Sequence, residues 1–268
     1  MSGSRSRFSW STAVGSRARD GLVPSAEQQA PANGASLQAN PGAAVASRDE
    51  SVPLALRRVS KRWSSNQPPV LDELDLRLDL GTKTWIGGRN GVGKTTLLRV
   101  AAGLIDPDQG SAEVWGFTAR ERHRRYQRLV SFLPAGDRGL YARVTVRHQL
   151  EFWARIALVA RSEVKSRAAE AIEKFDLVQL ADHRVDRMSM GQRQRLRIAM
   201  TFLPEPEIVL LDEPLTSLDA EGGVVLDRAI EELMARHGAL LWCSPSGEHL
   251  DQEFDTRLVL EQGKLVSA

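Results

Sequence analysis

A glycine-rich stretch between an apolar run and a helix-forming segment limits most strongly what this chain can fold into. It reads G-x-x-x-x-G-K-T over residues 88–95 and directly follows the apolar run 84–87. Such a loop lets backbone N–H groups close around phosphate oxygens at the start of a helix. The motif predicts a phosphate-binding loop, with a glycine-rich structural turn as the alternative. The residues expected to hold the ligand are Gly88, Asn90, Gly91, Val92, Gly93, Lys94, Thr95 and Thr96.

Four side chains in two segments suit phosphate and metal chemistry. Lys94 is expected to neutralise the β- and γ-phosphates, and the Thr95 hydroxyl to ligate Mg²⁺. Asp212 and Glu213 follow a second apolar run, and strand ends are where α/β sheets hold ligands. Asp212 is therefore a candidate metal ligand, and Glu213 a candidate base that polarises an attacking water. The alternative is that the acidic pair only caps the next helix.

Composition divides the chain into two unequal parts. Of the first 50 residues, 27 are Ser, Ala, Gly or Pro and only 6 are Leu, Ile, Val or Phe. Such a segment cannot bury enough apolar surface to offset its chain entropy, so we expect residues 1–50 to be a disordered extension. An organellar transit peptide is a less favoured interpretation of this Arg- and Ser-containing start. Residues 51–268 are expected to form one domain.

Charge and cysteine content exclude several classes of protein. The net charge is only +2, which argues against a strongly basic nucleic-acid binder. The single cysteine, Cys243, excludes an internal disulfide framework, and its apolar surroundings predict an inert core thiol. The basic residues between Arg120 and Arg128 are interpreted as a solvated helix face, so no nucleic-acid partner is expected.

The order of apolar segments predicts an α/β fold with an antiparallel section in front. Leucines alternate with charged residues from Leu74 to Leu80, which is typical of a half-buried strand. Later apolar runs are short, continuous and separated by helix-length segments, as in a covered parallel sheet. These runs are residues 129–133, 208–211, 239–243 and 257–260.

A third segment lies between the phosphate loop and the acidic pair. Ser189, Gly191 and Gln192 stand at the start of a helical stretch, where Ser189 also suits a simple N-cap. The three segments, in this order and spacing, resemble the ATP-binding cassette (ABC) ATPases, the nucleotide-binding subunits of ABC transporters. The resemblance covers roughly residues 52–266.

This resemblance implies a P-loop NTPase core with an antiparallel β subdomain and an inserted α-helical subdomain. It also implies ATP hydrolysis, with ATP and Mg²⁺ as cofactors. Trp63 falls where the family has an aromatic residue that stacks on adenine, although an exposed or core-packed tryptophan is the alternative. Ser189 and Gly191 match the family signature that closes over the triphosphate of a second domain, and Gln192 is expected to contact the nucleotide. The implied partners are a second ABC ATPase domain, as a homo- or heterodimer, and integral membrane permease subunits.

Two positions depart from the family pattern. Ala135 stands where a glutamine usually contacts the metal and water, and Pro245 stands near the place of a histidine that holds the γ-phosphate. Asp137 would bind metal only if the loop followed a different path from the one expected. Gln149 is not an obvious substitute for the usual glutamine. We therefore expect retained ATP binding with slow hydrolysis that relies on Glu213, helped by Ser244, Ser246 or His249, or else a degenerate half of an asymmetric pair.

The segment 136–150 resembles the corresponding stretch of bacterial type-2 exporter ATPases. In such systems this region touches the membrane subunit, so Tyr141, Phe152 and Trp153 are candidate docking residues, with packing inside the helical subdomain as the alternative. The resulting prediction is an ATPase subunit that is cytoplasmic and peripheral on the inner face of the membrane. A soluble non-transport ABC ATPase and a regulatory ATP-binding module are the competing functions.

Overall fold

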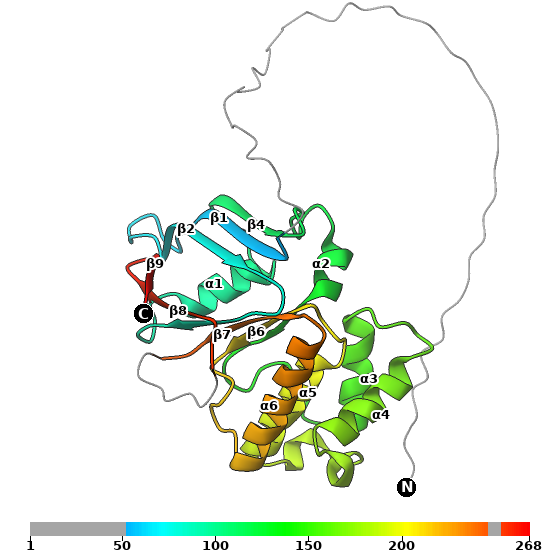
Figure 1. Ribbon diagram of the computed structural model, residues 1–268. Coiled ribbons are helices and arrows are strands. Elements are labelled where there is room, and N and C mark those ends of the chain that lie inside the picture. The colour runs from blue at the N-terminus through cyan, green and yellow to red at the C-terminus, as the bar shows by residue number, and fades with distance from the viewer. Residues whose placement is uncertain (1–51, 246–252) are drawn as a thin grey trace, which may run out of the picture. The chain divides into compact units, whose positions relative to one another are not determined.

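Two β-sheets and the helices that pack against them make up the part of the protein that the computed structural model describes, residues 52–245 and 253–268 (Figure 1). The expected disorder of residues 1–50 lies outside these described ranges. The first sheet is antiparallel and has the order β2-β1-β4, formed by β1 (Leu54–Lys61), β2 (Leu71–Leu78) and β4 (Gln109–Val114). Leu54 on the central strand pairs with Leu78 on one side and Val114 on the other. The expected antiparallel section is confirmed.

The strand β2 shows the alternation that its sequence predicts, with one correction. Leu71, Leu74, Leu76 and Leu78 are buried, whereas Leu80 is 40% exposed. Leu80 lies beyond the strand because a turn follows, in which the Thr82 hydroxyl donates to the Asp79 carbonyl at 2.7 Å.

The second sheet has the order β5-β6-β7-β3-β8-β9 within the described residues. Its strands are β3 (Lys83–Gly87), β5 (Val130–Leu133), β6 (Ile208–Asp212), β7 (Ala239–Cys243), β8 (Thr256–Glu261) and β9 (Lys264–Ser267). All neighbouring pairs are parallel except the β8–β9 hairpin. The continuous apolar runs thus lie where expected, and β6 and β7 are buried along their whole length.

Helices cover both faces of the parallel sheet. The helix α1 (Lys94–Ala101) packs between the two sheets, and its residues Leu97 and Leu98 are completely buried in a core shared with strands of both (Figure 1). On the opposite face, α5 (Met190–Phe202) and α6 (Ala220–Ala235) contribute to a second core, which contains Leu196 and Leu226.

A helical subdomain is inserted between β5 and β6, as expected. It contains α3 (Val146–Ile156), α4 (Val164–Lys174) and two short 3₁₀ helices, Val178–Leu180 and Val185–Arg187. In Figure 1, α3 and α4 lie beside α5 and on the opposite side of the parallel sheet from the antiparallel strands. No helix of the described ranges is long and apolar enough to cross a membrane.

The short helix α2 (His123–Leu129) bears the basic cluster, and the structure places these side chains in solvent. Arg122, Arg124, Arg125 and Arg128 are exposed, whereas Tyr126 between them is buried and donates to the Ala101 carbonyl. The Arg122 and Arg125 guanidinium carbons lie 5.4 and 4.8 Å from the centroid of the Phe117 ring. The geometry agrees with a solvated basic face held by one buried aromatic anchor.

Candidate functional site

The glycine-rich loop joins β3 to α1, so the motif forms the strand, loop and helix unit that phosphate binding requires. Gly93, directly before the helix, has a φ of 120°, and a Cβ placed there would lie 2.6 Å from Cγ1 of Val70. A Cβ at Gly88 would lie 2.9 Å from the Leu260 carbonyl. At both positions only glycine lets the backbone close this tightly, which leaves the N–H groups at the start of α1 facing the inside of the loop.

Lys94 lies within this loop. The side chain is 5% exposed, and Nζ donates to the carbonyls of Gly88 at 2.7 Å and Arg89 at 3.2 Å. The ammonium group is thus held where the loop would surround a phosphate. A triphosphate would compete for this cation with two neutral carbonyl oxygens, and a charge-assisted contact is the stronger one.

Thr95 and Asp212 meet although they are far apart in the sequence. The Thr95 hydroxyl donates to Oδ2 of Asp212 at 2.7 Å, because β6 ends beside the loop that begins α1. Asp212 is only 1% exposed, and its Oδ1 is buried without a hydrogen-bond partner. The sheet therefore brings together the two side chains that the sequence suggests as metal ligands.

The electrostatics of Asp212 suit a divalent cation. Burial raises the pKa of this carboxyl, while the Thr95 hydroxyl, the Ala135 N–H and the Lys94 charge act in the opposite direction. The Ala135 N–H approaches the carboxylate, but Oδ1 has no partner of regular hydrogen-bond geometry. A buried carboxylate with one unpartnered oxygen, next to a hydroxyl, offers the hard oxygen ligands that Mg²⁺ prefers.

Glu213 follows directly and has an unusual backbone. Its φ is 49°, in the left-handed region that non-glycine residues rarely adopt. The backbone is held by its N–H, which donates to the Cys243 carbonyl at 2.8 Å, and by its carbonyl, which accepts from Thr216 N–H at 3.2 Å. Strained residues of this kind cluster at functional sites, because the surrounding structure must keep them in place.

Trp63 lies beside the phosphate loop. Its Nε1 is 3.4 Å from the Thr96 hydroxyl, and the residue is 55% exposed. Lys61 places its ammonium group 5.6 Å from the centroid of the Trp63 ring. Because the side chain is neither core-packed nor distant from the loop, it can stack on a base attached to a bound phosphate chain.

The signature residues form the N-terminus of α5. The Ser189 hydroxyl accepts from the Gln192 N–H at 3.2 Å, and Oε1 of Gln192 accepts from the Ser189 N–H at 3.0 Å. This is a capping box, so the structural role considered for Ser189 is realised. A Cβ at Gly191 would lie 3.1 Å from Oδ2 of Asp219, so this N-terminus packs on the loop that follows Glu213.

Within the described ranges, no hydrogen bond joins the signature residues to the phosphate loop of the same chain. Met190, the first residue of α5, is 66% exposed. The structure thus brings together Trp63, Lys94, Thr95, Thr96, Asp212 and Glu213, and leaves the signature open to solvent.

A family model described as ABC transporter matches residues 71–216, more than half of the chain. The chain belongs to the ABC transporter family. It is therefore an ATP-binding protein and an ATP hydrolase of the ABC type.

Several curated relatives are ABC ATP-binding proteins. The chain is 29% identical over 215 residues to the ABC transporter ATP-binding protein NatA of Bacillus subtilis (strain 168), covering 80% of this chain and 87% of that one. It is 34% identical over 208 residues to the daunorubicin resistance ATP-binding protein DrrA3 of Streptomyces coeruleorubidus, covering 77% and 65%. The Fe(3+) ions import ATP-binding protein FbpC of Escherichia coli O157:H7 is 32% identical over 212 residues, covering 79% and 60%. The chain spans less than two thirds of the length of the last two relatives.

Solved ABC cassettes share the fold. An ATP-binding subunit of an ABC transporter superposes with a TM-score of 0.72 at 24% identity, covering 79% of this chain and 87% of that one. A dimeric ATP-binding cassette in a post-hydrolysis state with ADP and Pi gives a TM-score of 0.70 at 21% identity, covering 79% and 96%. The expected ABC ATPase fold is confirmed.

The loop after β5, which contains Ala135, is held by other side chains. Asp137 forms an ion pair with Arg193 at 3.2 Å, which directs its carboxylate to α5. Gln149 is fully buried and donates to the Gly139 carbonyl at 3.0 Å while accepting from Tyr141 N–H at 2.9 Å. Both side chains therefore hold the loop itself.

The segment after β7 contains the other residues that the sequence suggests as partial replacements. Ser244 is fully buried, and its hydroxyl accepts from Nε1 of Trp85 at 2.8 Å. The hydroxyl thus contacts the side chain of a neighbouring strand. Ser246 and His249, the other expected replacements, lie outside the described residues.

Sequence reasoning missed a group of buried polar residues on α5. Gln194, Arg195 and Arg197 are each less than a tenth exposed. The only signal in the sequence was the density of long polar side chains after Gly191, on a helix whose later positions are mainly apolar. That pattern is also typical of a half-exposed helix, so the burial was not evident.

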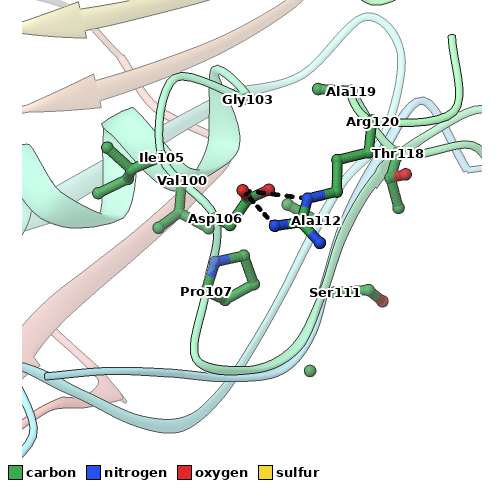
Figure 2. A pocket seen from close by; sticks show the side chains of 11 residues that line it. Val100, Gly103, Ile105, Asp106, Pro107, Ser111, Ala112, Thr118, Ala119 and Arg120 are labelled. Atoms are coloured by element: carbon green, nitrogen blue, oxygen red, sulfur yellow. Dashed lines mark hydrogen bonds and ion pairs between the residues drawn. The ribbon is translucent and has the colours of Figure 1, made fainter. Parts of the chain in front are cut away.

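The cavity in Figure 2 lies at the opposite end of α1 from the phosphate loop. It has a volume of about 150 Å³ and is lined by residues such as Val100, Pro107 and Ala119. An ion pair crosses it, with Nη2 of Arg120 2.9 Å from Oδ2 of Asp106. It is too small for a nucleotide, and it lies at the C-terminal end of α1, whereas the phosphate loop lies at the N-terminal end.

Proposed function

We propose that this chain is the ATP-binding and hydrolysing subunit of an ABC exporter, and that it works as a dimer against membrane subunits. The observation that carries the proposal is the meeting of Thr95 and Asp212 at 2.7 Å beside the buried Lys94. It provides a cation for the β- and γ-phosphates and oxygen ligands for Mg²⁺ in one place. Trp63 is the residue proposed to stack on adenine.

Within this proposal, each residue has a defined task. Thr95 and Asp212 hold Mg²⁺, which neutralises developing phosphate charge when it is bound. Lys94 moves from its loop carbonyls to the triphosphate. Glu213 accepts the proton of the attacking water as the bond from the γ-phosphorus to the bridging oxygen breaks. The remaining loop residues, Gly88 to Thr96, supply N–H groups to the phosphates.

A second copy would complete the site. The N-terminus of α5 is exposed at Met190, and a helix N-terminus with a serine hydroxyl stabilises phosphate charge. In the dimer, Ser189, Gly191 and Gln192 of one domain would face the triphosphate held by the other. A monomer is accordingly expected to hydrolyse ATP slowly, and the replacement of the usual glutamine and histidine by Ala135 and Pro245 is expected to slow it further.

ATP-driven dimerisation is the experiment that tests this proposal. In a Glu213→Gln background, which slows hydrolysis, ATP with Mg²⁺ should double the mass measured by size-exclusion chromatography with light scattering. Adding Met190→Glu should keep the protein monomeric, because a carboxylate at the start of α5 repels the facing triphosphate. The fold should survive, since an acidic residue is favourable at a helix N-terminus.

Met190→Gln is the matched control, because it has nearly the same shape without the charge and should still dimerise. Equal dimerisation of the Glu and Gln variants would show that α5 does not face the nucleotide. A protein that stays monomeric with ATP at every concentration would refute the dimer mechanism.

Docking on a membrane subunit is supported by an exposed aromatic pair. Tyr141 and Phe152 are 53% and 42% exposed, and their rings pack edge to face with centroids 5.2 Å apart. Trp153, the third candidate, is partly buried against the helical core and is not offered as a contact. Tyr141 lies directly after the loop that contains Ala135, so a partner seated here could affect the nucleotide site.

The partner is tested by co-expression with any membrane protein that a neighbouring gene encodes. Both chains should co-purify from membranes, and Tyr141→Glu with Phe152→Glu should abolish this. Val178→Glu, which adds a charge at an equally exposed position elsewhere, should leave co-purification intact. Retention of the double variant on the membrane subunit would rule out this docking surface.

Export, as the direction of transport, is favoured by similarity to a daunorubicin resistance protein, whereas the similarity to an Fe(3+) importer leaves import as the alternative. Export predicts ATP-dependent accumulation of substrate inside inside-out vesicles that contain both chains. Uptake confined to right-side-out vesicles would overturn it.

The regulatory alternative, an ATP-binding module without turnover, is supported by Ala135 and Pro245 and predicts no hydrolysis above that of Glu213→Gln.

A further inference from the structure

Arg197 is a buried cation on α5 that has no part in the roles proposed above for the nucleotide site. It is 4% exposed, and burial lowers its pKa, while the nearby Asp137 carboxylate acts in the opposite direction. Because burying a guanidinium is costly unless its donors are satisfied, the groups that Arg197 contacts indicate what it is for.

The guanidinium contacts both ends of the loop after β5. Nη2 donates to the Pro134 carbonyl, and Nε donates to the Arg138 carbonyl at 3.1 Å. The three peptide units between residues 135 and 138 thus lie between two anchored carbonyls, and Ala135 is among the residues enclosed. A lysine could not make both contacts, since it lacks the planar fork of donors.

The peptide unit between Pro134 and Ala135 makes contacts on both of its sides. Its carbonyl accepts from Arg197, and its N–H approaches the Asp212 carboxylate. Because a peptide unit is rigid and planar, fixing the carbonyl fixes the direction of the N–H. Arg197 therefore controls, through one peptide, a group next to the proposed metal ligand.

A second route leads from Arg197 to the other carboxylate. Nη1 donates to Oε1 of Gln194, and Nε2 of Gln194 donates to the Pro214 carbonyl at 2.7 Å. Pro214 directly follows Glu213. The helix that begins with the signature is thus hydrogen-bonded to the backbone beside both Asp212 and Glu213.

We propose that Arg197 is a positioning residue for ATP hydrolysis, which orients the Pro134–Ala135 peptide and, through Gln194, the backbone after Glu213. Since Ala135 offers no side-chain amide, the contact of this loop with the catalytic carboxylates is made by its main chain. A main-chain contact keeps its direction only if other groups hold the peptide unit. Arg197 holds this peptide through its hydrogen bond to the Pro134 carbonyl. The inference rests on the roles proposed above for Asp212 and Glu213.

The test compares Arg197→Lys and Arg197→Met with the full-length parent. Lysine keeps the charge without the fork, and methionine keeps the length without the charge. We expect kcat to fall by about 10- to 100-fold in both, with KM for ATP changed by less than about threefold, because small misplacement at a reacting centre costs rate more than binding. Arg138→Met is the matched control on the same loop. The Arg138 side chain is exposed, and only its main-chain carbonyl contacts Arg197, so this variant should change kcat by less than about twofold.

Hydrogen–deuterium exchange without nucleotide provides a readout independent of activity. Amides of residues 135–139 should exchange at least about fivefold faster in both Arg197 variants, while those of β2 remain unchanged. A purely structural role would instead lower the melting temperature and raise exchange throughout the α5 core, with kcat per folded molecule preserved.

The outcomes separate this inference from the proposed function. Parental kcat in both Arg197 variants, or unchanged exchange of the loop, would overturn the positioning role. If the parent shows no turnover above Glu213→Gln, the proposed function fails, and the exchange data still decide whether Arg197 orients the loop.

Discussion

Replacing Glu213 by Gln should lower ATP turnover by about 100- to 1,000-fold while ATP binding is retained. The expectation follows from the typical contribution of a general base, about 10²- to 10⁴-fold. The lower part of that range is expected because, in the proposed function, Ala135 and Pro245 stand in place of two further catalytic contacts. The measurement is steady-state phosphate release beside nucleotide binding by calorimetry.

A control acid on α6 tests whether the effect is specific to Glu213. Glu231 is exposed on α6, so Glu231→Gln should hydrolyse ATP at the parental rate. Because Gln has nearly the shape of Glu, the strained backbone at φ 49° should persist, and the melting temperature should stay close to that of the parent. A Glu213→Gln variant with more than about a third of the parental turnover would show that another group takes the proton.

Asp212→Asn should make the metal-free protein more stable and nearly inactive. The parent buries a carboxylate whose Oδ1 has no partner, and such a group costs about 1–3 kcal/mol. Burial raises the pKa of Asp212, so the folded state favours the protonated form, and this contribution to stability is lost as pH rises through the raised pKa. The variant does not titrate, so its stability advantage should grow as the pH rises above about 4, where the carboxyl of the unfolded parent ionises.

The second part of this prediction concerns how the parent and Asp212→Asn respond to Mg²⁺. Mg²⁺ with ATP should stabilise the parent more than the variant, because a ligand stabilises only the folded state that binds it. Turnover of the variant should fall by at least about 100-fold, since charge stabilisation at the transferred phosphate is lost. Denaturant unfolding with and without Mg²⁺ gives the free energies of unfolding. The control is Asp182→Asn, whose side chain is 82% exposed. An equal response of both variants to Mg²⁺ would refute the role of Asp212 as a ligand.

Local patterns in the sequence predicted most of the fold. The alternation in β2 and the continuous apolar runs of β5, β6 and β7 were sufficient, because period and composition reflect whether one or both faces of a strand are buried. Leu80 was assigned wrongly, since alternation alone does not show where a turn ends a strand. The phosphate loop was evident for a related reason: all of its groups lie within a few consecutive residues.

Other parts of the site depend on contacts between distant residues. Thr95 and Asp212 were both identified as metal ligands from motifs, but their hydrogen bond exists only because β6 and β3 end at the same edge of one sheet. Similarly, the sequence made Ser244 a candidate phosphate contact, and only the structure showed that its hydroxyl accepts a hydrogen bond from Trp85. A sequence shows which groups a hydroxyl or carboxylate could contact, whereas packing selects one of them.

The sequence by itself determined the family, the phosphate loop and the acidic pair, because these depend on backbone conformations and residue types set within short segments. Only the tertiary structure decided how the loop that contains Ala135 is supported. Arg197 and Gln149 reach that loop from two helices, and neither contact follows from residue spacing. The physical reason is that the destination of a buried polar side chain is set by the need to satisfy its hydrogen bonds in three dimensions.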